Sequence, residues 1–296
     1  MLKKTNTTPI VPFSLNCKGD LIFLDTPKIM GVLNITPDSF YDGGRYNAEG
    51  QVLAQVEKMI KEGATFIDIG AYSSRPGAAE VSEEEEAKRL YPILQAILKR
   101  FPEGLLSIDT FRSSIAKNAI EMGAALINDI SAGELDPEMI PTVGKLGVPY
   151  VMMHMRSTPK DMQEHTHYEH LLQEIISYFS EKIDRAKKHN ITDIIIDPGY
   201  GFAKTTKQNF ELLRESALLN TFGVPVLTGV SRKSMIYKTL NTTAQDALNG
   251  TTALHMQALI NGSSILRVHD VAAAYFQLHM SQTLSAIYHW LLWNMV

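Results

Sequence analysis

The last short apolar segment of the chain ends in side chains that could bind an anion. Residues 263–271 read SSILRVHDV and pass, without a turn residue, from apolar side chains to Arg267, His269 and Asp270. Side chains alternate in direction along a strand, so Arg267 and His269 would point to one face and Val268 to the other. We expect Arg267 and His269 to face an anionic group, whereas Asp270 would cap or orient a neighbouring element.

Polar residues also end or follow the other short apolar segments. They are Asn34, Ser74, Arg75, Asp109, Asn128, Asp129, His154, Asp197 and Lys233. Three acids have a purely structural interpretation as well, because Asp68 lies inside its segment and Asp129 and Asp270 could each cap the element that follows. One polar residue at such a position is common, but the same pattern at every segment end indicates one shared site.

The chemistry of these residues divides into two groups. Asp109, Asn128 and Asp197 could accept hydrogen bonds from a flat heterocycle with several N–H donors, and Lys233 could bond a ring carbonyl. The second group offers donors, positive charge or both, as an anion requires, and comprises Asn34, Ser74, Arg75, Arg267 and His269. Ser231 is a plausible N-cap, so a helix dipole would add to the positive charge. We expect a ring at the bottom of the site and phosphate at the top.

These side chains would be positioned by short strands that alternate with helices. Each apolar segment is nearly continuous in Val, Ile, Leu or Met, which is typical of a parallel strand buried on both faces. The strands are expected at 28–33, 66–69, 105–108, 126–127, 149–153, 194–196, 225–227 and 265–268. Helical periodicity lies between them, for example at 49–62, 82–100, 111–122 and 171–189.

Eight strand–helix units predict an α/β fold of the (β/α)8 TIM-barrel class, in which all strand ends meet at one rim. An open doubly wound sheet has the same alternation, but no G-x-G-x-x-G turn follows the first strand. Upstream, residues 13–17 and 21–24 flank Lys18-Gly19-Asp20 and predict a β-hairpin that covers the bottom of the barrel. We expect a single domain over 1–296, with an N-terminal extension and hairpin over 1–25 and the barrel over 26–296.

The composition is that of a globular intracellular protein. The formal net charge of -4 gives no general attraction to nucleic acid or acidic membranes, so we expect neither as a partner. Cys17 is the only cysteine, which excludes an intrachain disulfide and favours a reducing, cytoplasmic location. No long apolar stretch follows the N-terminal lysines, so a signal peptide is not expected. The segment 272–293 is apolar on more than one face, which fits a homodimer contact or packing within one subunit.

Eight motifs of the chain resemble those of the dihydropteroate synthases of folate biosynthesis. They are VLNITPDSF (32–40), DIGAYSSRPGA (68–78), SIDTFR (107–112), LINDISAG (126–133), MMHMRSTPKDMQ (152–163), DPGYGFAKT (197–205), TGVSRKSMI (228–236) and RVHDV (267–271). They occur in the family's order, one at each strand end, from about residue 28 to 271. The resemblance implies a TIM barrel and a transferase. Its reaction joins 6-hydroxymethyl-7,8-dihydropterin diphosphate to p-aminobenzoate and releases pyrophosphate.

The resemblance also implies roles for individual residues. A pterin pocket would comprise Asp109, Asn128, Asp197 and Lys233, with Met153 and Phe202 as apolar walls. The diphosphate would be held by Ser74, Arg75, Arg267 and His269, with Asn34 as a ligand of Mg²⁺. Asp38, in a first loop that would close over the site, would stabilise positive charge on the pterin methylene, and Ser234 with the second loop would bind p-aminobenzoate. The residues expected to act in catalysis are Asp38, Asp109, Lys233, Arg267 and His269.

Two alternative functions would share the ring pocket. A pterin-binding methyltransferase, which passes a methyl group from a folate to a corrinoid protein, needs no diphosphate clamp. A non-catalytic pterin-binding paralogue would have lost loop or clamp residues. The combination of SSRPG, SRK and RVHDV favours the synthase. The second loop departs from the family, since Tyr72 stands where an acid is frequent and Ser74 replaces Thr, although Ser74 keeps the hydroxyl.

Overall fold

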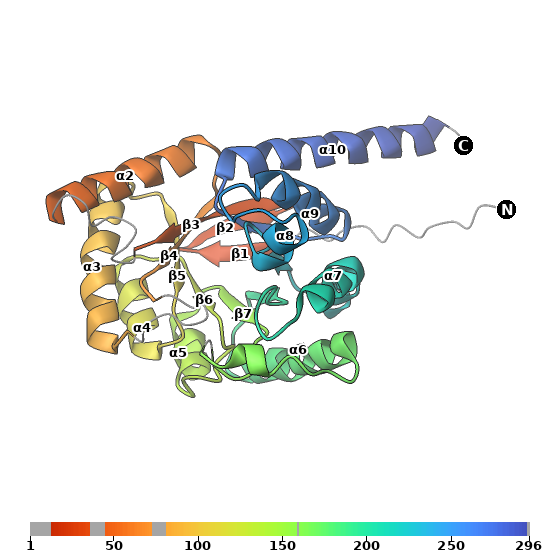
Figure 1. Cartoon of the computed structure of the whole chain (residues 1–296). Helices are drawn as coiled ribbons and strands as arrows, with labels where there is room; N and C mark the ends of the chain where they lie inside the picture. The colour runs from red at the N-terminus through yellow and green to blue at the C-terminus, as the bar shows by residue number, and fades with distance from the viewer. Residues whose placement is uncertain (1–12, 36–44, 73–80, 159, 295–296) are drawn as a thin grey trace.

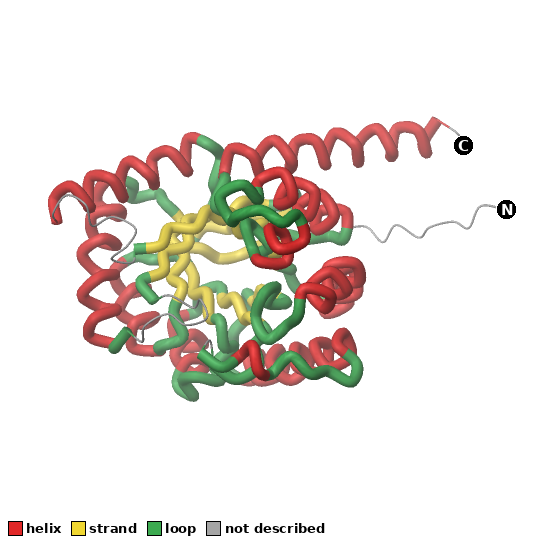
Figure 2. The backbone as a smooth tube through the Cα atoms, viewed as in Figure 1, coloured by secondary structure: helices red, strands yellow, loops and turns green. Residues whose placement is uncertain are grey.

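The protein is a barrel of parallel strands with helices packed around it, as the sequence predicts (Figures 1 and 2). The computed structural model describes residues 13–35, 45–72, 81–158 and 160–294. The barrel strands are β3 (Lys28–Asn34), β4 (Phe66–Gly70), β5 (Leu105–Asp109), β6 (Leu126–Asp129), β7 (Tyr150–Met153), β8 (Ile194–Asp197), β9 (Leu227–Thr228) and β10 (Ile265–Val268). The α-helices are α2 (Arg45–Lys61), α3 (Glu83–Arg100), α4 (Ser113–Met122), α5 (Met139–Leu146), α6 (Leu171–Lys188), α7 (Thr206–Glu215), α8 (Ser234–Thr239), α9 (Leu248–Ile260) and α10 (Val271–Asn294). No helix in these described ranges is both long and apolar enough to cross a membrane.

The eight-stranded sheet runs in the order β8-β7-β6-β5-β4-β3-β10-β9, and its two ends meet. A parallel bridge between Ile196 and Val226 joins β8 to the segment before β9, where Ile196 N donates to Pro225 O at 3.0 Å. The sequence placed this strand at 225–227, but the regular pairing covers Leu227–Thr228. Proline has no N–H to give to a ladder, which explains why Pro225 contributes only its carbonyl.

Alternation along each strand separates two cores. Residues that point outward, such as Ile69, Ile108 and Leu266, pack against the helices in one large apolar cluster. Residues that point inward at the lower end of the strands form a second cluster, which includes Met30, Phe66, Leu126, Val151, Ile195, Leu227 and Ile265. The apolar residues hold the lower barrel together, because buried apolar area contributes roughly 25 cal/mol per Å².

The N-terminal hairpin closes the bottom of the barrel, as predicted. Its strands are β1 (Phe13–Cys17) and β2 (Asp20–Leu24), which pair antiparallel. Lys18 and Gly19 form the connecting turn with φ of 58° and 93°, the left-handed conformation that such two-residue loops require. Leu15, Cys17 and Leu24 belong to the inner cluster of the lower barrel. The hairpin therefore excludes solvent from the bottom of the barrel, opposite to the carboxyl ends of the strands.

Candidate active site

A row of polar residues crosses the upper ends of neighbouring strands. Strand pairing sets Asn34 opposite Gly70, Gly70 opposite Asp109, and Asp109 opposite Asn128. A β-carbon built on Gly70 would lie 3.6 Å from Asn34 Oδ1 and 3.6 Å from Asp109 Oδ2. The absence of a side chain at Gly70 thus lets the two oxygen-bearing groups flank one space at the rim.

Arg267 reaches across the barrel and binds two carboxylates. Its Nε donates to Asp68 Oδ2 at 2.6 Å and its Nη2 donates to Asp109 Oδ2 at 2.8 Å. Val268, the next residue, points outward into the helix-facing core, as the alternation predicts. Asp68 was not predicted to belong to the site, because it lies inside β4. The alternation of side chains along the strand could have identified Asp68, because Asp68 is one of the inward-pointing residues of β4.

Asp68 also binds the neighbouring strands β5 and β6. Ser107 donates its hydroxyl to Asp68 Oδ1 at 2.6 Å, and Asn128 Nδ2 donates to Asp68 Oδ2 at 3.0 Å. Asp68, Ser107 and Asn128 are all nearly or fully buried. The network therefore joins Asp109 and Asn128, two predicted pocket residues, through Arg267 and Asp68.

The carboxyl ends of the strands enclose a space that is called the mouth of the barrel. Asp197 and Lys233 lie on the side of this mouth opposite to Asp109 and Asn128. A β-carbon built on Gly229 would lie 3.8 Å from Asp197 Oδ2, 3.9 Å from Lys233 Nζ and 3.9 Å from Arg267 Cβ. Lys233 Nζ donates to Tyr200 O and lies 4.9 Å from the centre of the Phe202 ring. Asp197 Oδ1 accepts from Gly199 N at 2.8 Å, which fixes the carboxylate.

The predicted apolar walls lie in one place. Met153 belongs to a small buried cluster with Ile130, Met155, Met162 and Ala203, against which Phe202 packs. Strand pairing sets Met153 directly beside Asp197. An apolar surface therefore adjoins the acceptor and cation groups, as a flat heterocycle requires.

Burial dominates the electrostatics of the mouth. It raises the pKa of Asp109 to about 7, with nearby Asp68 acting in the same direction and Arg267 opposing it. Burial also raises the pKa of Asp197, against the nearby Lys233 cation. It lowers the pKa of Lys233 to about 8, although Asp197 and Asp109 oppose that change. The Arg267 pKa is raised, since Asp68 and Asp109 outweigh the effect of burial. Shifts toward the neutral form, as at Asp109, Asp197 and Lys233, are typical of a functional site.

The comparison with known proteins decides the family. The model of the pterin-binding enzymes matches residues 30–269. The chain is 40% identical to dihydropteroate synthase of Escherichia coli K12 over 259 residues, which are 87% of this chain and 91% of the relative. It is 42% identical over 248 residues to the Synechocystis dihydropteroate synthase, covering 83% of this chain and 86% of that one. This chain belongs to the dihydropteroate synthases.

Solved dihydropteroate synthases have the same fold. The Yersinia pestis enzyme in complex with a sulfonamide drug superposes with a TM-score of 0.87 at 38% identity, over 93% of this chain and 100% of that one. The Xanthomonas albilineans enzyme with 4-aminobenzoic acid superposes with a TM-score of 0.86 at 36% identity, over 92% and 98% of the two chains. The predicted barrel and transferase function are confirmed.

Two predictions about the last strands need correction or refinement. Ser231 is not the N-cap of α8, because that helix begins at Ser234 with Lys233 at the N-cap position. Instead the Ser231 hydroxyl accepts from His269 N at 3.1 Å and lies 3.1 Å from His269 Nδ1. Asp270 orients a neighbour, since its carboxylate accepts from Arg232 Nε at 2.8 Å and Nη2 at 2.7 Å. The six-residue α8 therefore supplies no Ser231-capped dipole, and Ser234 is its first residue.

Asp129 has the structural role that the sequence allowed. Its carboxylate accepts from Ser131 N at 2.7 Å, Gly133 N at 2.7 Å and Tyr150 Oη at 2.6 Å. Asp129 is fully buried and faces outward, toward the helices. It therefore caps the turn after β6 and contributes to the strand ends only indirectly.

Lys204, which was not predicted as a site residue, is buried. Lys204 Nζ donates to Gly199 O and Phe202 O, each at 3.0 Å, and lies 3.0 Å from His154 Nδ1. Burial lowers the pKa of both Lys204 and His154. Through these contacts Lys204 and His154 hold the loop that carries Phe202 against the end of β7. The segment DPGYGFAKT held the only signal, a lysine among glycines.

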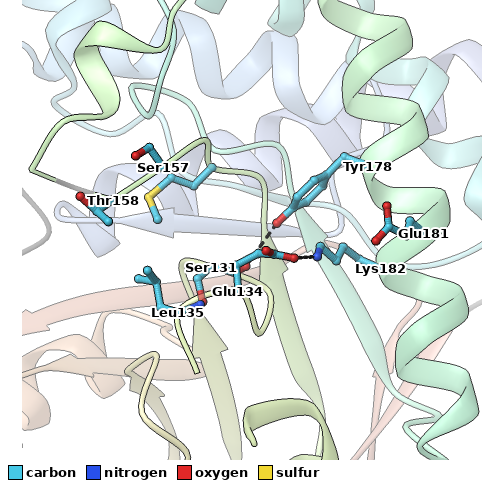
Figure 3. A pocket seen from close by; sticks show the side chains of 9 residues that line it. Ser131, Glu134, Leu135, Ser157, Thr158, Tyr178, Glu181 and Lys182 are labelled. Carbon is cyan, nitrogen blue, oxygen red and sulfur yellow. Dashed lines mark hydrogen bonds and ion pairs between the residues drawn. The ribbon is translucent and has the colours of Figure 1, made fainter. Parts of the chain in front are cut away.

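A cavity lies apart from the predicted site residues (Figure 3). It has a volume of about 510 Å³ and lies between the turn after β6, the segment after β7 and α6. Lys182 pairs there with Glu134, and Tyr178 donates to Ser131 O at 3.3 Å. None of the predicted site residues lines it. Three predicted site residues, Asp38, Ser74 and Arg75, lie outside the residues that the structure describes.

Proposed function

We propose that this chain joins 6-hydroxymethyl-7,8-dihydropterin diphosphate to p-aminobenzoate and releases pyrophosphate. The observation that supports this most directly is the pairing of acceptors and cations in one barrel mouth. Asp109 and Asn128 lie on one side, Asp197 and Lys233 on the other, and Arg267 binds Asp109. A pterin needs acceptors for its N–H groups and a donor for its carbonyl, and its diphosphate needs cations.

The pterin ring would lie between Asp109, Asn128, Asp197 and Lys233, with Met153 and Phe202 as walls. Lys233 stacks over the Phe202 ring and would donate to the ring carbonyl. The carboxylates would accept ring N–H groups. Because these groups are buried or half-buried and already hydrogen-bonded, they would bind the ring with little reorganisation.

The diphosphate would bind above the ring. Arg267 lies near the end of β10, and His269 directly follows the strand. Both would therefore meet a ligand that enters from the rim. We assign Ser74 and Arg75 of the second loop to the same group. Arg267 also binds Asp109, so we propose that it links the ring site to the diphosphate site rather than serving the diphosphate alone.

Mg²⁺ fits the rim near Asn34. Asn34 Oδ1 is a hard oxygen donor of the type that Mg²⁺ prefers, and it borders the space beside Gly70. Among the described residues no group of three or more His, Cys, Asp or Glu side chains could hold a metal alone. Asn34 would thus share the ion with diphosphate oxygens and water. When bound, Mg²⁺ supplies positive charge that favours the departure of pyrophosphate.

In the proposed reaction the bond between the pterin methylene carbon and the diphosphate oxygen breaks first. Pyrophosphate takes the electron pair, and the methylene becomes a cation delocalised into the ring. Asp109, Asp197 and, from the first loop, Asp38 stabilise this charge. The amine of p-aminobenzoate, bound near Ser234 and the second loop, attacks the carbon and loses a proton. The solved Xanthomonas enzyme with 4-aminobenzoic acid supports the choice of the second substrate.

We propose that two copies of the chain associate through α10. Figure 1 shows α10 running beyond the barrel. Phe276, Met280, Leu284 and Ile287 form a stripe along it, and each has more than half of its surface exposed, from 52% to 68%. Apolar stripes of this kind mark protein interfaces. Light scattering should give a dimer mass, which Met280→Glu should reduce to that of a monomer.

One assay tests the reaction and separates it from the alternatives. Pure protein with Mg²⁺ and dihydropterin diphosphate should release pyrophosphate, and p-aminobenzoate should convert the pterin to dihydropteroate. No release under either condition would refute the synthase reaction and leave a methyltransferase or a non-catalytic binder. Arg267→Ala should weaken binding of the diphosphate far more than binding of free pterin, whereas Asp197→Asn should weaken both.

A further inference from the structure

We propose that Asp68 is a positioning residue of the proposed ring and diphosphate site. Its carboxylate holds Arg267 and Asn128 in the orientations in which they meet the substrate. The proposal rests on the assignment of these two residues to that site. It assigns to Asp68 no contact with the reacting atoms.

Both carboxylate oxygens of Asp68 accept hydrogen bonds from the protein. Oδ1 accepts from the Ser107 hydroxyl at 2.6 Å, and Oδ2 accepts from Asn128 Nδ2 at 3.0 Å and from Arg267 Nε at 2.6 Å. The side chain is 0% exposed, in the middle of β4. It can therefore act on a ligand only through the groups that it binds.

The contact with Asn128 decides which end of that amide the ligand meets. A carboxylate without a proton only accepts, so the Asn128 NH₂ group must face Asp68 and its carbonyl oxygen Oδ1 must face away. Asn128 then presents an acceptor to the mouth, which suits a ring N–H. With an amide at position 68 the Asn128 side chain could bind in either orientation.

The contact with Arg267 fixes the plane of the guanidinium. Asp68 takes Nε–H and Asp109 takes one N–H of Nη2, so the described residues use two of the five N–H donors. The other three remain for an anionic ligand. Without Asp68 the guanidinium could turn about its bond to Asp109, and its free donors would no longer point in one direction.

A purely structural role does not explain this arrangement. Buried ion pairs contribute little to stability compared with apolar packing, and one layer below the same inner face is filled by Met30, Phe66 and Leu126. Here Asp68 and Asp109 share one arginine, which leaves an excess of negative charge in a desolvated place. Such an arrangement is expected where orientation of a ligand matters more than stability.

Asp68→Asn tests the proposal, with Asp129→Asn as the matched control. Asp129 is equally buried and has several donors, but those donors are Ser131, Gly133 and Tyr150, which belong to no proposed site. Steady-state kinetics should be measured from pH 5.5 to 9.5, together with the melting temperature of each variant. Binding of 6-hydroxymethyl-7,8-dihydropterin should be measured by calorimetry.

Asp68→Asn should lower kcat/KM for the pterin diphosphate by about 10²-fold, because misplaced groups cost about that factor. KM for p-aminobenzoate should change little. The acidic limb of the pH profile should move to lower pH, because removing the Asp68 charge lets Asp109 ionise more easily. Asp129→Asn should lower the melting temperature and leave pterin affinity unchanged, and it should move the pH limb less than Asp68→Asn does, because Asp129 raises the Asp109 pKa less strongly than Asp68.

Wild-type kinetics or an unmoved acidic limb in folded Asp68→Asn would overturn the proposal. If that variant fails to fold, Ser107→Ala replaces it. This change keeps the charges of Asp68 and Arg267 and removes only the hydrogen bond to Asp68 Oδ1. It should lower kcat/KM several-fold and also lower the melting temperature, because the buried Asp68 Oδ1 loses its donor, and unchanged kcat/KM would equally refute the positioning role. Absence of pyrophosphate release by the wild type would instead refute the proposed reaction.

Discussion

The proposed site requires an ionised Asp109 and a protonated Lys233, so activity should be confined to a narrow pH range. The pKa of Asp109 is raised to about 7 and that of Lys233 is lowered to about 8, in both cases first by burial. Below the first value Asp109 gains a proton and no longer accepts fully from the ring. Above the second value Lys233 loses its charge. Treated as independent groups, the two are correctly charged together in about 60% of molecules at pH 7.5 and in about 9% at pH 6 or pH 9.

The predicted result is a bell-shaped profile of kcat/KM for the pterin diphosphate, with about a sixfold loss on each side of the maximum. Pyrophosphate release should be followed in a coupled assay, with dilution back to pH 7.5 to show that losses are reversible. Because the groups interact, the limbs report apparent values of the whole cluster. Lys233→Arg should move the alkaline limb upward and out of the range, since arginine stays charged. A flat profile between pH 6 and 9, or an alkaline limb that Lys233→Arg does not move, would refute the assignment.

Three further changes test the energetics of the barrel. Arg267→Ala leaves Asp68 and Asp109 without their partner, so urea denaturation should show a loss of roughly 3–5 kcal/mol, and Arg267→Lys should restore stability better than activity. Folding raises the Asp109 pKa, so the associated stability is present below about pH 4 and is lost as the pH rises toward 7. Asp109→Asn should therefore raise the melting temperature at pH 8 relative to the wild type, with no gain at pH 4. Leu15→Ala should cost roughly 2–5 kcal/mol in urea denaturation without changing KM for the pterin diphosphate, because Leu15 packs in the lower core.

The strands were predictable from the sequence because their burial is extreme. Segments such as 265–268 and 105–108 are apolar on both faces, and the structure places strands there, with β5 extended to Asp109. The bounds of strand β9 were less predictable. They depend on where the strand pairs with β10 and on Pro225, which has no N–H to give to the pairing. The helix starts depended on local chemistry. Ser82 caps α3, but Ser231, which was expected to cap α8, binds His269 instead.

From the strand pattern alone, the site was predictable mainly where a residue lies at or near a strand end. Asp109, Asn128 and Asp197 stand at strand ends, and the structure brings them to one mouth. Asp68 stands two residues earlier in its strand, and its contact with Arg267 joins residues 199 positions apart. No local pattern predicts such a contact. The alternation of side chains identifies Asp68 as an inward-pointing candidate. Only the closed barrel shows that Arg267 reaches it.

The distribution of charge in the mouth connects the fold to the proposed reaction. Among the residues that the structure describes, the acids Asp68, Asp109 and Asp197 and the bases Arg267 and Lys233 meet in the mouth, so full ionisation of these five groups leaves one negative charge in excess. In the resting protein this excess is unfavourable, which agrees with the raised pKa of Asp109. In the proposed reaction the pterin methylene becomes a cation when pyrophosphate leaves, and the excess negative charge of these five groups then meets an opposite charge. An interaction that is unfavourable before the bond breaks and favourable afterwards accelerates that step, because only stabilisation specific to the transition state does so.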